Sequence, residues 1–204
     1  MKTDLIERMM ASTQLPEMLR ALNQKWEEEQ RRRHQFWADI RDDVKAEFIN
    51  GQVVYHSPVR KIHNVVHFNL ILTIGSHVKA KKLGFLGFEK VMTRFTRNDY
   101  EPDLCFWKKE KADAFTDDQT VFPVPDFIVG ILSRSTAAID RGIKMEDYAR
   151  HGVTEYWIID PGQKTVEQYI LTAHSYNPPL KLKTGHLVST VIEGLTVTVE
   201  ELFG

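Results

Sequence analysis

Apolar residues recur at helical spacing near the start of the chain. From Thr13 onward they are separated mostly by three or four residues, or by whole multiples of a turn: Leu15, Met18, Leu22, Trp26, Trp37, Ile40 and Val44. Pro16 and Glu17 suit the first turn of a helix. The spacing predicts one long helix, whose apolar seam could pack on the rest of the chain or on a second copy of it.

The middle of this predicted helix is strongly charged. Glutamates at positions 27–29 lie four residues before arginines at 31–33, which is the favourable order for ion pairs on a helix. Because the two runs cancel, we interpret this segment as an exposed salt-bridged face rather than a phosphate-binding patch.

Two short apolar runs at 46–49 and 52–55 flank Asn50 and Gly51, a pair that tolerates positive φ and strongly favours a hairpin. A second helix is expected over about 60–82. We expect Gly84 to end it in a left-handed cap.

The second half alternates strand and helix signals. Strands are predicted at about 85–95, 104–107 and 127–132, with a loop at 108–120. Hydroxyls within 133–136 introduce a helix that runs to about His151, and a hairpin over 154–159 and 165–171 turns at Pro161-Gly162. A turn at 199–203 ends the chain. This mixture predicts an α/β or mixed α+β fold, with helices packed against a sheet.

Length and composition set limits on the organisation. The 204 residues, 42% hydrophobic, suffice for one core, so we expect an N-terminal helical extension (1–44) before one domain (45–204). A net charge of −1 gives no overall attraction to polyanions. Cys105 has no partner for an internal disulfide, and neither a membrane-spanning run nor a secretory signal is evident, so we expect a cytoplasmic protein with no membrane partner.

Asp103 is the first candidate for chemistry, because it opens the apolar run Leu-Cys-Phe-Trp, where β propensity does not explain an aspartate. Metal-dependent phosphodiesterases use oxygen ligands of this kind on adjacent strands, with a cation nearby. A Pro-Asp turn that merely starts the strand explains the residue equally well. Both interpretations stay open on the residues alone.

A longer pattern carries a family resemblance. It comprises Glu101 to Asp103, the run Pro-Asp-Phe-Ile-Val-Gly-Ile-Leu-Ser over 125–133, Ser-Arg-Ser-Thr over 133–136, Asp140, Lys144, Tyr148, and Gly-Val-Thr-Glu-Tyr-Trp-Ile-Ile-Asp over 152–160. This pattern resembles the Uma2 family, a branch of the PD-(D/E)XK nuclease superfamily. The resemblance implies a restriction-endonuclease-like central mixed sheet flanked by helices, and Mg²⁺ or Mn²⁺ as cofactor. It also implies that Asp103 is the first metal ligand, position 130 the second, and Lys144 the superfamily lysine displaced onto a helix.

Gly130 departs from the family pattern, because members usually carry glutamate there. A glycine inside a strand also costs about 0.5–1 kcal/mol relative to alanine. Natural decay and deliberate removal of the glutamate both explain it. Asp126 is about 13 Å along the same strand, too far to replace the ligand, whereas Glu101, Glu146 and Glu155 could approach.

Two further residues are candidates for the same site. Glu47, in a Glu-Phe-Ile-Asn-Gly segment that resembles the family's Glu-Leu-Ile-Asp-Gly, either lines the site or is an ordinary exposed residue beside the hairpin. His63 matches a family histidine and is expected to face the cleft, while His67 is expected to be a packed or surface residue. Asn64 follows His63 where a zinc protease needs glutamate, so we reject that motif.

The resemblance implies a Mg²⁺-dependent DNA endonuclease of Uma2 type that is impaired by the loss at Gly130, with RNA kept open as a substrate. The alternative is a non-catalytic nucleic-acid-binding or protein-assembly module on a nuclease scaffold. In either case we expect a homodimer formed through the N-terminal helix.

Overall fold

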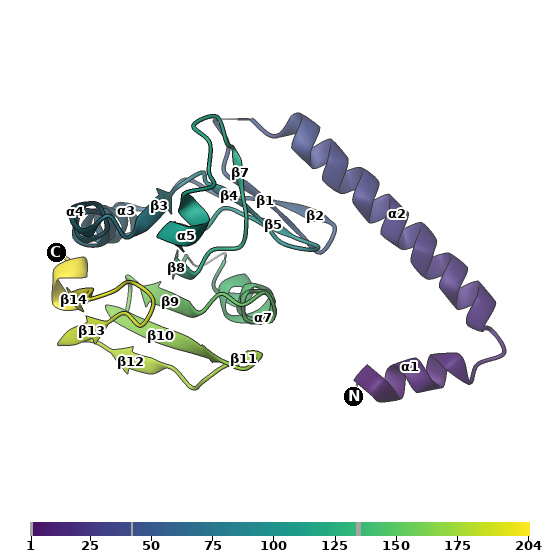
Figure 1. The fold of residues 1–204 in the computed structure, drawn as a ribbon. Coiled ribbons are helices and arrows are strands. Elements are labelled where there is room, and N and C mark those ends of the chain that lie inside the picture. Colours follow the sequence, from purple (N-terminus) through teal and green to yellow (C-terminus); the bar gives the residue numbers. More distant parts are fainter. Residues whose placement is uncertain (1, 42, 134–135) are drawn as a thin grey trace.

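Two helices form an N-terminal arm in the computed structural model, which describes residues 2–41, 43–133 and 136–204 (Figure 1). Helix α1 (Lys2–Met10) was not predicted, and α2 (Leu15–Asp39) is the predicted long helix. Helix α2 ends before Ile40, whose backbone is extended. Ile40 and Val44, expected to continue the helix, instead pack beyond its end against a cluster that contains Phe36 and Phe48.

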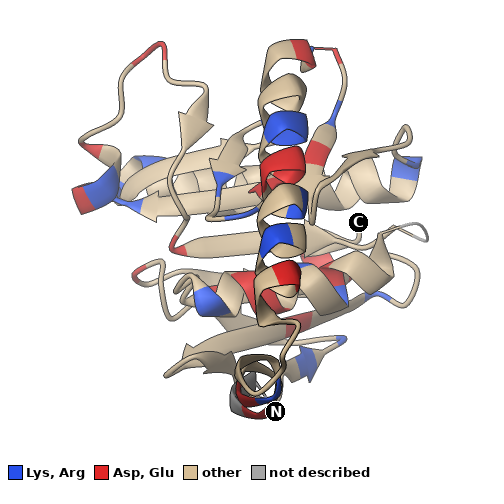
Figure 2. Cartoon of the chain, turned by 90° about the vertical axis from the view of Figure 1, so that its right-hand side faces the viewer, with Lys and Arg blue, Asp and Glu red and all other residues tan. Residues whose placement is uncertain are grey.

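The arm is held to the body by its C-terminal half. Arg33 donates to both oxygens of the fully buried Asp99, at 2.7 Å each, and Arg97 donates to both oxygens of Glu29 at 2.7 Å. Such bidentate pairs fix orientation as well as position. Figure 2 shows α2 running across the body with basic and acidic residues interspersed along it. The predicted seam is therefore split: Phe36 and Trp37 dock on the body, whereas Trp26 is 47% exposed.

The chain next forms the predicted hairpin of β1 (Ala46–Ile49) and β2 (Gln52–Tyr55). Asn50 and Gly51 have φ of 47° and 80°, as the turn requires. The hairpin belongs to a five-stranded sheet of order β2-β1-β5-β4-β7, completed by β4 (Met92–Arg94), β5 (Asp99–Tyr100) and β7 (Val121–Phe122). The single strand expected over 85–95 is thus two strands in different sheets.

A larger mixed sheet forms the centre of the body, in the order β11-β10-β9-β8-β6-β3 with β12 also beside β10. Its strands are β3 (Gly84–Phe88), β6 (Leu104–Lys108), β8 (Phe127–Ile131), β9 (Glu155–Asp160), β10 (Thr165–Thr172), β11 (Ser175–Tyr176) and β12 (Leu180–Leu182). Strands β8 and β9 are parallel, and the neighbouring pairs are antiparallel. The predicted mixed sheet and the hairpin of β9 and β10 are confirmed.

Both predicted internal helices contain a π-helical turn. The first consists of α3 (Lys61–Leu70), the π turn η1 (Ile71–Gly75) and α4 (Ser76–Lys81). The second consists of α6 (Ala137–Ile139), the π turn η2 (Asp140–Lys144) and α7 (Met145–Arg150). Two of the residues proposed to introduce this second helix, at 134 and 135, lie outside the described residues.

The expected glycine cap of the first helix was wrong. Lys82 takes the left-handed conformation there, with φ of 54°, and Gly84 already belongs to β3. Glycine is needed at 84 for another reason: a Cβ on its backbone, at φ 150°, would lie 2.0 Å from the carbonyl oxygen of Trp107. The remaining elements are α5 (Lys109–Ala112) inside the expected loop, β13 (His186–Val188), β14 (Thr196–Thr198) and the 3₁₀ turn η3 (Glu200–Leu202).

Strand alternation divides the interior into two cores, one on each face of the large sheet. Leu104, Val129 and Trp157 face a core closed by α3, α4 and the C-terminal segment. Cys105, Ile128 and Tyr156 face the other core, closed by α7 and by side chains of the smaller sheet. Glu47, Asp140 and Lys144, discussed below, lie on this second side, where Tyr100 also packs.

Candidate active site

Asp103 and Gly130 lie near adjoining ends of two neighbouring strands, Asp103 just before β6 and Gly130 within β8. Leu104 pairs with Val129 in the antiparallel ladder of β6 and β8, and extending that register by one step would place Asp103 opposite Gly130. Opposite residues in such a ladder point to the same face. The N–H of Ile131 donates to Oδ2 of Asp103 at 2.7 Å, which holds the carboxylate beside β8. The two positions proposed as metal ligands are therefore brought together.

Asp103 already has a cationic partner. Lys45, in the segment just before β1, donates from Nζ to Oδ1 of Asp103 at 2.8 Å, and His63 Nε2 lies 3.7 Å from the same oxygen. The two side chains of the lysine–aspartate pair are only 18% and 15% exposed. Burial alone would raise the pKa of Asp103, but Lys45 and then His63 hold it well below its ordinary value. Conversely, burial would lower the pKa of Lys45, but Asp103 raises it.

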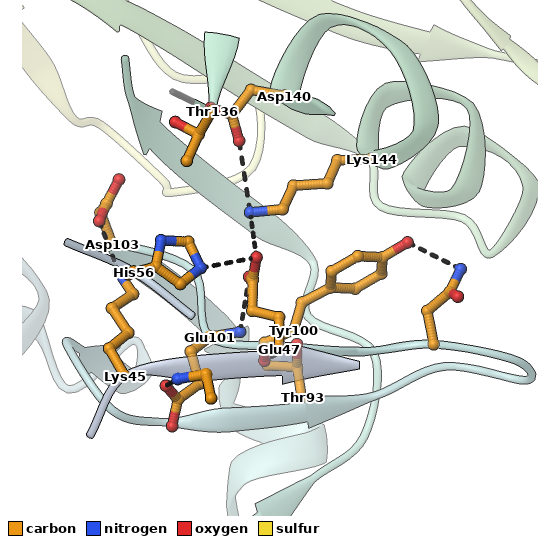
Figure 3. A network of polar contacts seen from close by, with 12 residues as sticks. Lys45, Glu47, His56, Thr93, Tyr100, Glu101, Asp103, Thr136, Asp140 and Lys144 are labelled. Carbon is orange, nitrogen blue, oxygen red and sulfur yellow. Dashed lines mark hydrogen bonds and ion pairs between the residues drawn. The ribbon is translucent and has the colours of Figure 1, made fainter. Parts of the chain in front are cut away.

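Glu47 projects from β1 into the same cluster and is 1% exposed (Figure 3). Its Oε1 accepts the N–H of Glu101 at 2.9 Å, and its Oε2 lies 2.9 Å from Lys144 Nζ and 3.0 Å from His56 Nε2. Burial raises its pKa, yet Lys144 and His56 together lower it to about 2. The interpretation of Glu47 as an ordinary exposed residue beside the hairpin was therefore wrong.

Lys144 connects two acids. Its Nζ lies between Glu47 Oε2 and Asp140 Oδ1, at 2.9 and 3.3 Å, and 5.7 Å from the ring centre of Tyr100. The pairing with Asp140 one turn earlier is the expected one, but both side chains are buried rather than exposed. Burial lowers the pKa of Lys144, and Glu47 and Asp140 raise it beyond its ordinary value. Burial raises the pKa of Asp140.

Gly130 faces Tyr156, so the vacant position borders this cluster. A Cβ placed at Gly130 would lie 3.0 Å from the Tyr156 hydroxyl, which donates to the carbonyl of Asp140 at 3.3 Å. A side chain at 130 would thus enter the same core as Lys144, after Tyr156 moves by a few tenths of an ångström.

The acids considered as replacements serve other purposes. Glu155 faces the opposite core, where its oxygens accept hydrogen bonds from neutral donors including Trp157 and Gln168. Glu146 is exposed and lies 3.7 Å from Arg150. Asp126 accepts the N–H of Lys108 at the far end of β8.

Glu101 comes nearer but points elsewhere. Its Oε2 accepts the N–H of Ala46 at 3.0 Å, and burial raises its pKa to about 7. This carboxyl is therefore engaged with β1 rather than with the position opposite Asp103.

The residues present do not fit a divalent metal as they stand. No group of three or more histidine, cysteine, aspartate or glutamate side chains within the described ranges could hold a metal ion. Mg²⁺ demands several oxygen ligands in near-octahedral geometry, and Asp103 offers oxygens that already accept from Lys45 and Ile131. Position 130 contributes no side-chain ligand.

Two members of the cluster were missed by sequence reasoning, Lys45 and His56. A signal was available for both. Lys45 lies two residues before Glu47 in an extended segment, so its side chain points to the same side, and the N–H of His56 donates to the carbonyl of Lys45 across the hairpin. His67, expected to be packed or on the surface, is packed: its Nε2 lies 2.8 Å from the carbonyl oxygen of Asp103 and its Nδ1 lies 2.9 Å from Glu89.

Comparison with known proteins agrees with this arrangement. The model of the Uma2 family, described as "Putative restriction endonuclease", matches residues 26–200, which is most of the chain. The chain belongs to the Uma2 family. Restriction-endonuclease-like families generally use divalent metals, and a nuclease family suggests a nucleic acid substrate. The Uma2 match begins at residue 26 and leaves α1 and the first half of α2 outside it.

A solved structure supports the Uma2 fold. The crystal structure of a "putative nuclease belonging to DUF820" from Anabaena variabilis superposes with a TM-score of 0.67 at 19% identity, covering 78% of this chain and 89% of the other. At this identity the likeness establishes the nuclease-like fold. No curated protein matches the chain. Within the described residues, none of the helices has the length and apolar character needed to span a bilayer.

Proposed function

We propose that this chain is a Uma2-type DNA endonuclease whose metal-dependent hydrolysis is impaired because glycine stands at position 130. The observation that carries the proposal is the hydrogen bond from the N–H of Ile131, the neighbour of Gly130, to the Asp103 carboxylate, together with a buried cluster that contains Glu47 and Lys144. The family relationship supplies the expectation of a metal ligand at 130. Whether the glycine arose naturally or was introduced does not change the proposal.

Each residue has a defined part in the proposed site. With glutamate restored at 130, that carboxylate and Asp103 would hold Mg²⁺ or Mn²⁺, which would supply polarisation of the phosphate and a more acidic water. Lys144, fixed by Glu47 and Asp140, places a buried cation in the core that a side chain at 130 would enter, where it can stabilise negative charge on a phosphate. Glu47 positions Lys144. His63, 3.7 Å from Asp103, positions that carboxylate.

The test is to restore the acid. Gly130→Glu should nick supercoiled plasmid DNA in the presence of Mg²⁺ or Mn²⁺, whereas the present chain should show little or no cleavage. Gly130→Gln is the matched control, because it has the same size and no charge, and Asp103→Asn in the Gly130→Glu background should abolish the gain. Parallel assays with single-stranded DNA and RNA decide between substrates. If folded Gly130→Glu cleaves none of these, the proposed activity is wrong.

A second candidate function is a non-catalytic nucleic-acid-binding or assembly module. One observation favours it: the oxygen of Asp103 that would face a metal is paired with Lys45. Binding of duplex DNA or a protein partner by the present chain, with no gain from Gly130→Glu, would support this function. The lysines at 108, 109 and 111 lie at the end of β6 remote from Asp103, roughly 17 Å away by strand geometry. DNA contacts there would thus be independent of the candidate site.

We further propose that two copies associate through the N-terminal half of the arm. Leu19, Leu22 and Trp26 are 48%, 51% and 47% exposed, and they share one stretch of α2. A second copy of the same helix offers an identical apolar stripe. Leu22→Glu should convert a dimer into a monomer in light scattering, while the exposed polar control Asn23→Glu should not. A monomeric parent chain would refute this proposal.

We also propose that the extension (1–44) and the domain (45–204) are separate structural units. If the division is right, a chain that begins at residue 45 should fold after the surface left by Phe36 is made polar. A cytoplasmic location stays a prediction.

A further inference from the structure

The Lys45 side chain occupies the place of a cation at Asp103. Its ammonium nitrogen is 2.8 Å from Oδ1, while Oδ2 accepts the N–H of Ile131 at 2.7 Å. His63 Nε2 is 3.7 Å from Oδ1 on the same side. Each oxygen of the carboxylate therefore already has a partner from the chain itself.

A divalent ion and this lysine compete for Oδ1. Mg²⁺ binds carboxylate oxygen at about 2.0–2.1 Å, and an ammonium held 2.8 Å from the same oxygen would lie a few ångströms from the ion. Like charges at such separation repel strongly where water is scarce. Because both side chains of the pair are largely buried, a metal could enter only after Lys45 leaves its position.

The second lysine of the cluster does not compete in the same way. Lys144 Nζ is shared by Glu47 and Asp140, and no described contact joins it to Asp103. Loss of a carboxylate at 130 therefore leaves Asp103 and Lys45 as a neutral pair that needs no further charge.

We propose that Lys45 is a built-in counter-ion that substitutes for the divalent metal at Asp103, so that glutamate at 130 alone restores only part of the metal affinity. The inference rests on the proposed function for the identity of the metal site. It adds that the present chain is adapted to a metal-free state, by a residue outside the family's metal-ligand pattern.

The test measures metal binding without DNA. Mn²⁺ affinity, from electron paramagnetic resonance of free Mn²⁺ and from calorimetry, is compared for the parent chain, Gly130→Glu, Lys45→Met, and the double variant. We expect no measurable binding by the parent chain and weak binding by Gly130→Glu. The double variant should bind roughly ten- to a hundredfold more tightly than Gly130→Glu, the scale of changes next to metal ligands.

Two controls keep the outcome interpretable. Lys111→Met in the Gly130→Glu background removes a lysine that also lies 2.8 Å from an aspartate, Asp126, outside the site, and should leave Mn²⁺ affinity unchanged. Lys45→Gln keeps a hydrogen-bond donor without charge. It replaces Lys45→Met if that variant does not fold, and should show the same gain.

Equal Mn²⁺ affinity with and without Lys45 in the Gly130→Glu background overturns the inference, even if that variant cleaves DNA. Tighter binding in the double variant with no cleavage of DNA or RNA supports the inference while refuting the proposed activity. The two failures are thus distinguishable.

Discussion

Glu47 and Glu155 are both buried glutamates, and the chain neutralises them in opposite ways. Glu155 is 0% exposed, and its oxygens accept two and four hydrogen bonds from side-chain and backbone donors that carry no charge. Glu47 is paired with the ammonium group of Lys144 and also contacts the His56 ring and one backbone N–H. Neutral donors fix a carboxylate permanently, whereas cationic partners can be exchanged for other cations. Neutral hydrogen bonds thus stabilise Glu155, whereas an ion pair with Lys144 stabilises Glu47.

Glu155→Gln should have the largest effect on stability, and it tests whether the neutral donors around Glu155 require a carboxylate. An amide cannot accept hydrogen bonds at both ends, so either orientation sets its NH₂ group against donors such as Trp157 or Thr190. We expect a loss of about 4 kcal/mol in the free energy of unfolding, measured by urea denaturation. The exposed Glu193→Gln is the control and should change stability by less than about 0.5 kcal/mol. A tolerated Glu155→Gln would remove the distinction between the two glutamates.

Lys144→Met should be the next largest effect. It leaves Glu47 and Asp140 without their shared cation, and removal of one partner from a buried ion pair costs about 3–5 kcal/mol. Lys144 is the main group that lowers the pKa of Glu47, so the loss should depend on pH. The lowered pKa of Glu47 stabilises the fold above its ordinary value of 4.5, and this stabilisation fades as pH falls toward about 2.

The difference between Lys144→Met and the parent chain should therefore be largest between about pH 5 and 10 and shrink in acid. Unfolding curves at pH 3 and pH 7 measure it. A difference independent of pH would show that Lys144 contributes mainly through packing.

Glu101→Gln tests a carboxyl beside the site whose pKa is shifted upward, opposite to that of Glu47. Its pKa is raised to about 7, so the folded state holds a proton between pH 4.5 and 7 that the unfolded state releases. The fold consequently loses stability as pH rises through this window. Glu101→Gln should stabilise the protein at pH 8, by on the order of 1–3 kcal/mol, and have almost no effect at pH 4.5. Thermal unfolding of both proteins across pH 4.5–8 measures this difference in stability. Equal stability of the variant and the parent chain at pH 8 would contradict the raised pKa of Glu101.

Tyr156→Phe should have the smallest effect on stability. It tests whether a side chain at position 130 approaches Tyr156. In the present chain it removes one hydrogen bond, from Tyr156 to the carbonyl of Asp140, and should cost about 1 kcal/mol. In the Gly130→Glu background it removes the hydroxyl that crowds the new Cβ, so the cost should vanish or reverse. A double-mutant cycle of unfolding free energies measures this coupling. Additive effects would mean that a side chain at 130 does not approach Tyr156.

Sequence patterns identified most of the framework, because turn chemistry and strand alternation are local. The Asn50-Gly51 hairpin is confirmed, and so is the antiparallel pairing of β9 and β10. Local patterns could not reveal that the 85–95 segment divides between two sheets, since pairing partners are far away in sequence. The helix cap shows the same limit: Lys82 takes the left-handed conformation expected of Gly84, because Gly84 pairs with the distant Lys108 in the sheet.

The site was predicted in part for the same physical reason. The pairing of Asp103 with position 130 follows from family pattern and strand order. Its ion partner Lys45 is 58 residues away, and charge alone does not say which carboxylate a lysine will meet. From the sequence, Glu155 was as good a candidate for the missing ligand as Glu101 or Glu146. In the structure the alternation of β9 places its side chain in the opposite core, together with Trp157.

The π turn η2 has a consequence for aligning relatives of this chain. Lys144 is its last residue, and a π turn holds one residue more than the α turn it replaces. Deleting one residue between Asp140 and Lys144 would restore a regular α turn with both flanks in place, whereas keeping all five residues in a regular α-helix would rotate one flank by about 100° relative to the other. Homologues with a regular helix here must therefore carry the equivalent amine one step earlier in the count from β8. An ungapped alignment across this turn would match Lys144 to a side chain on the wrong side of the helix.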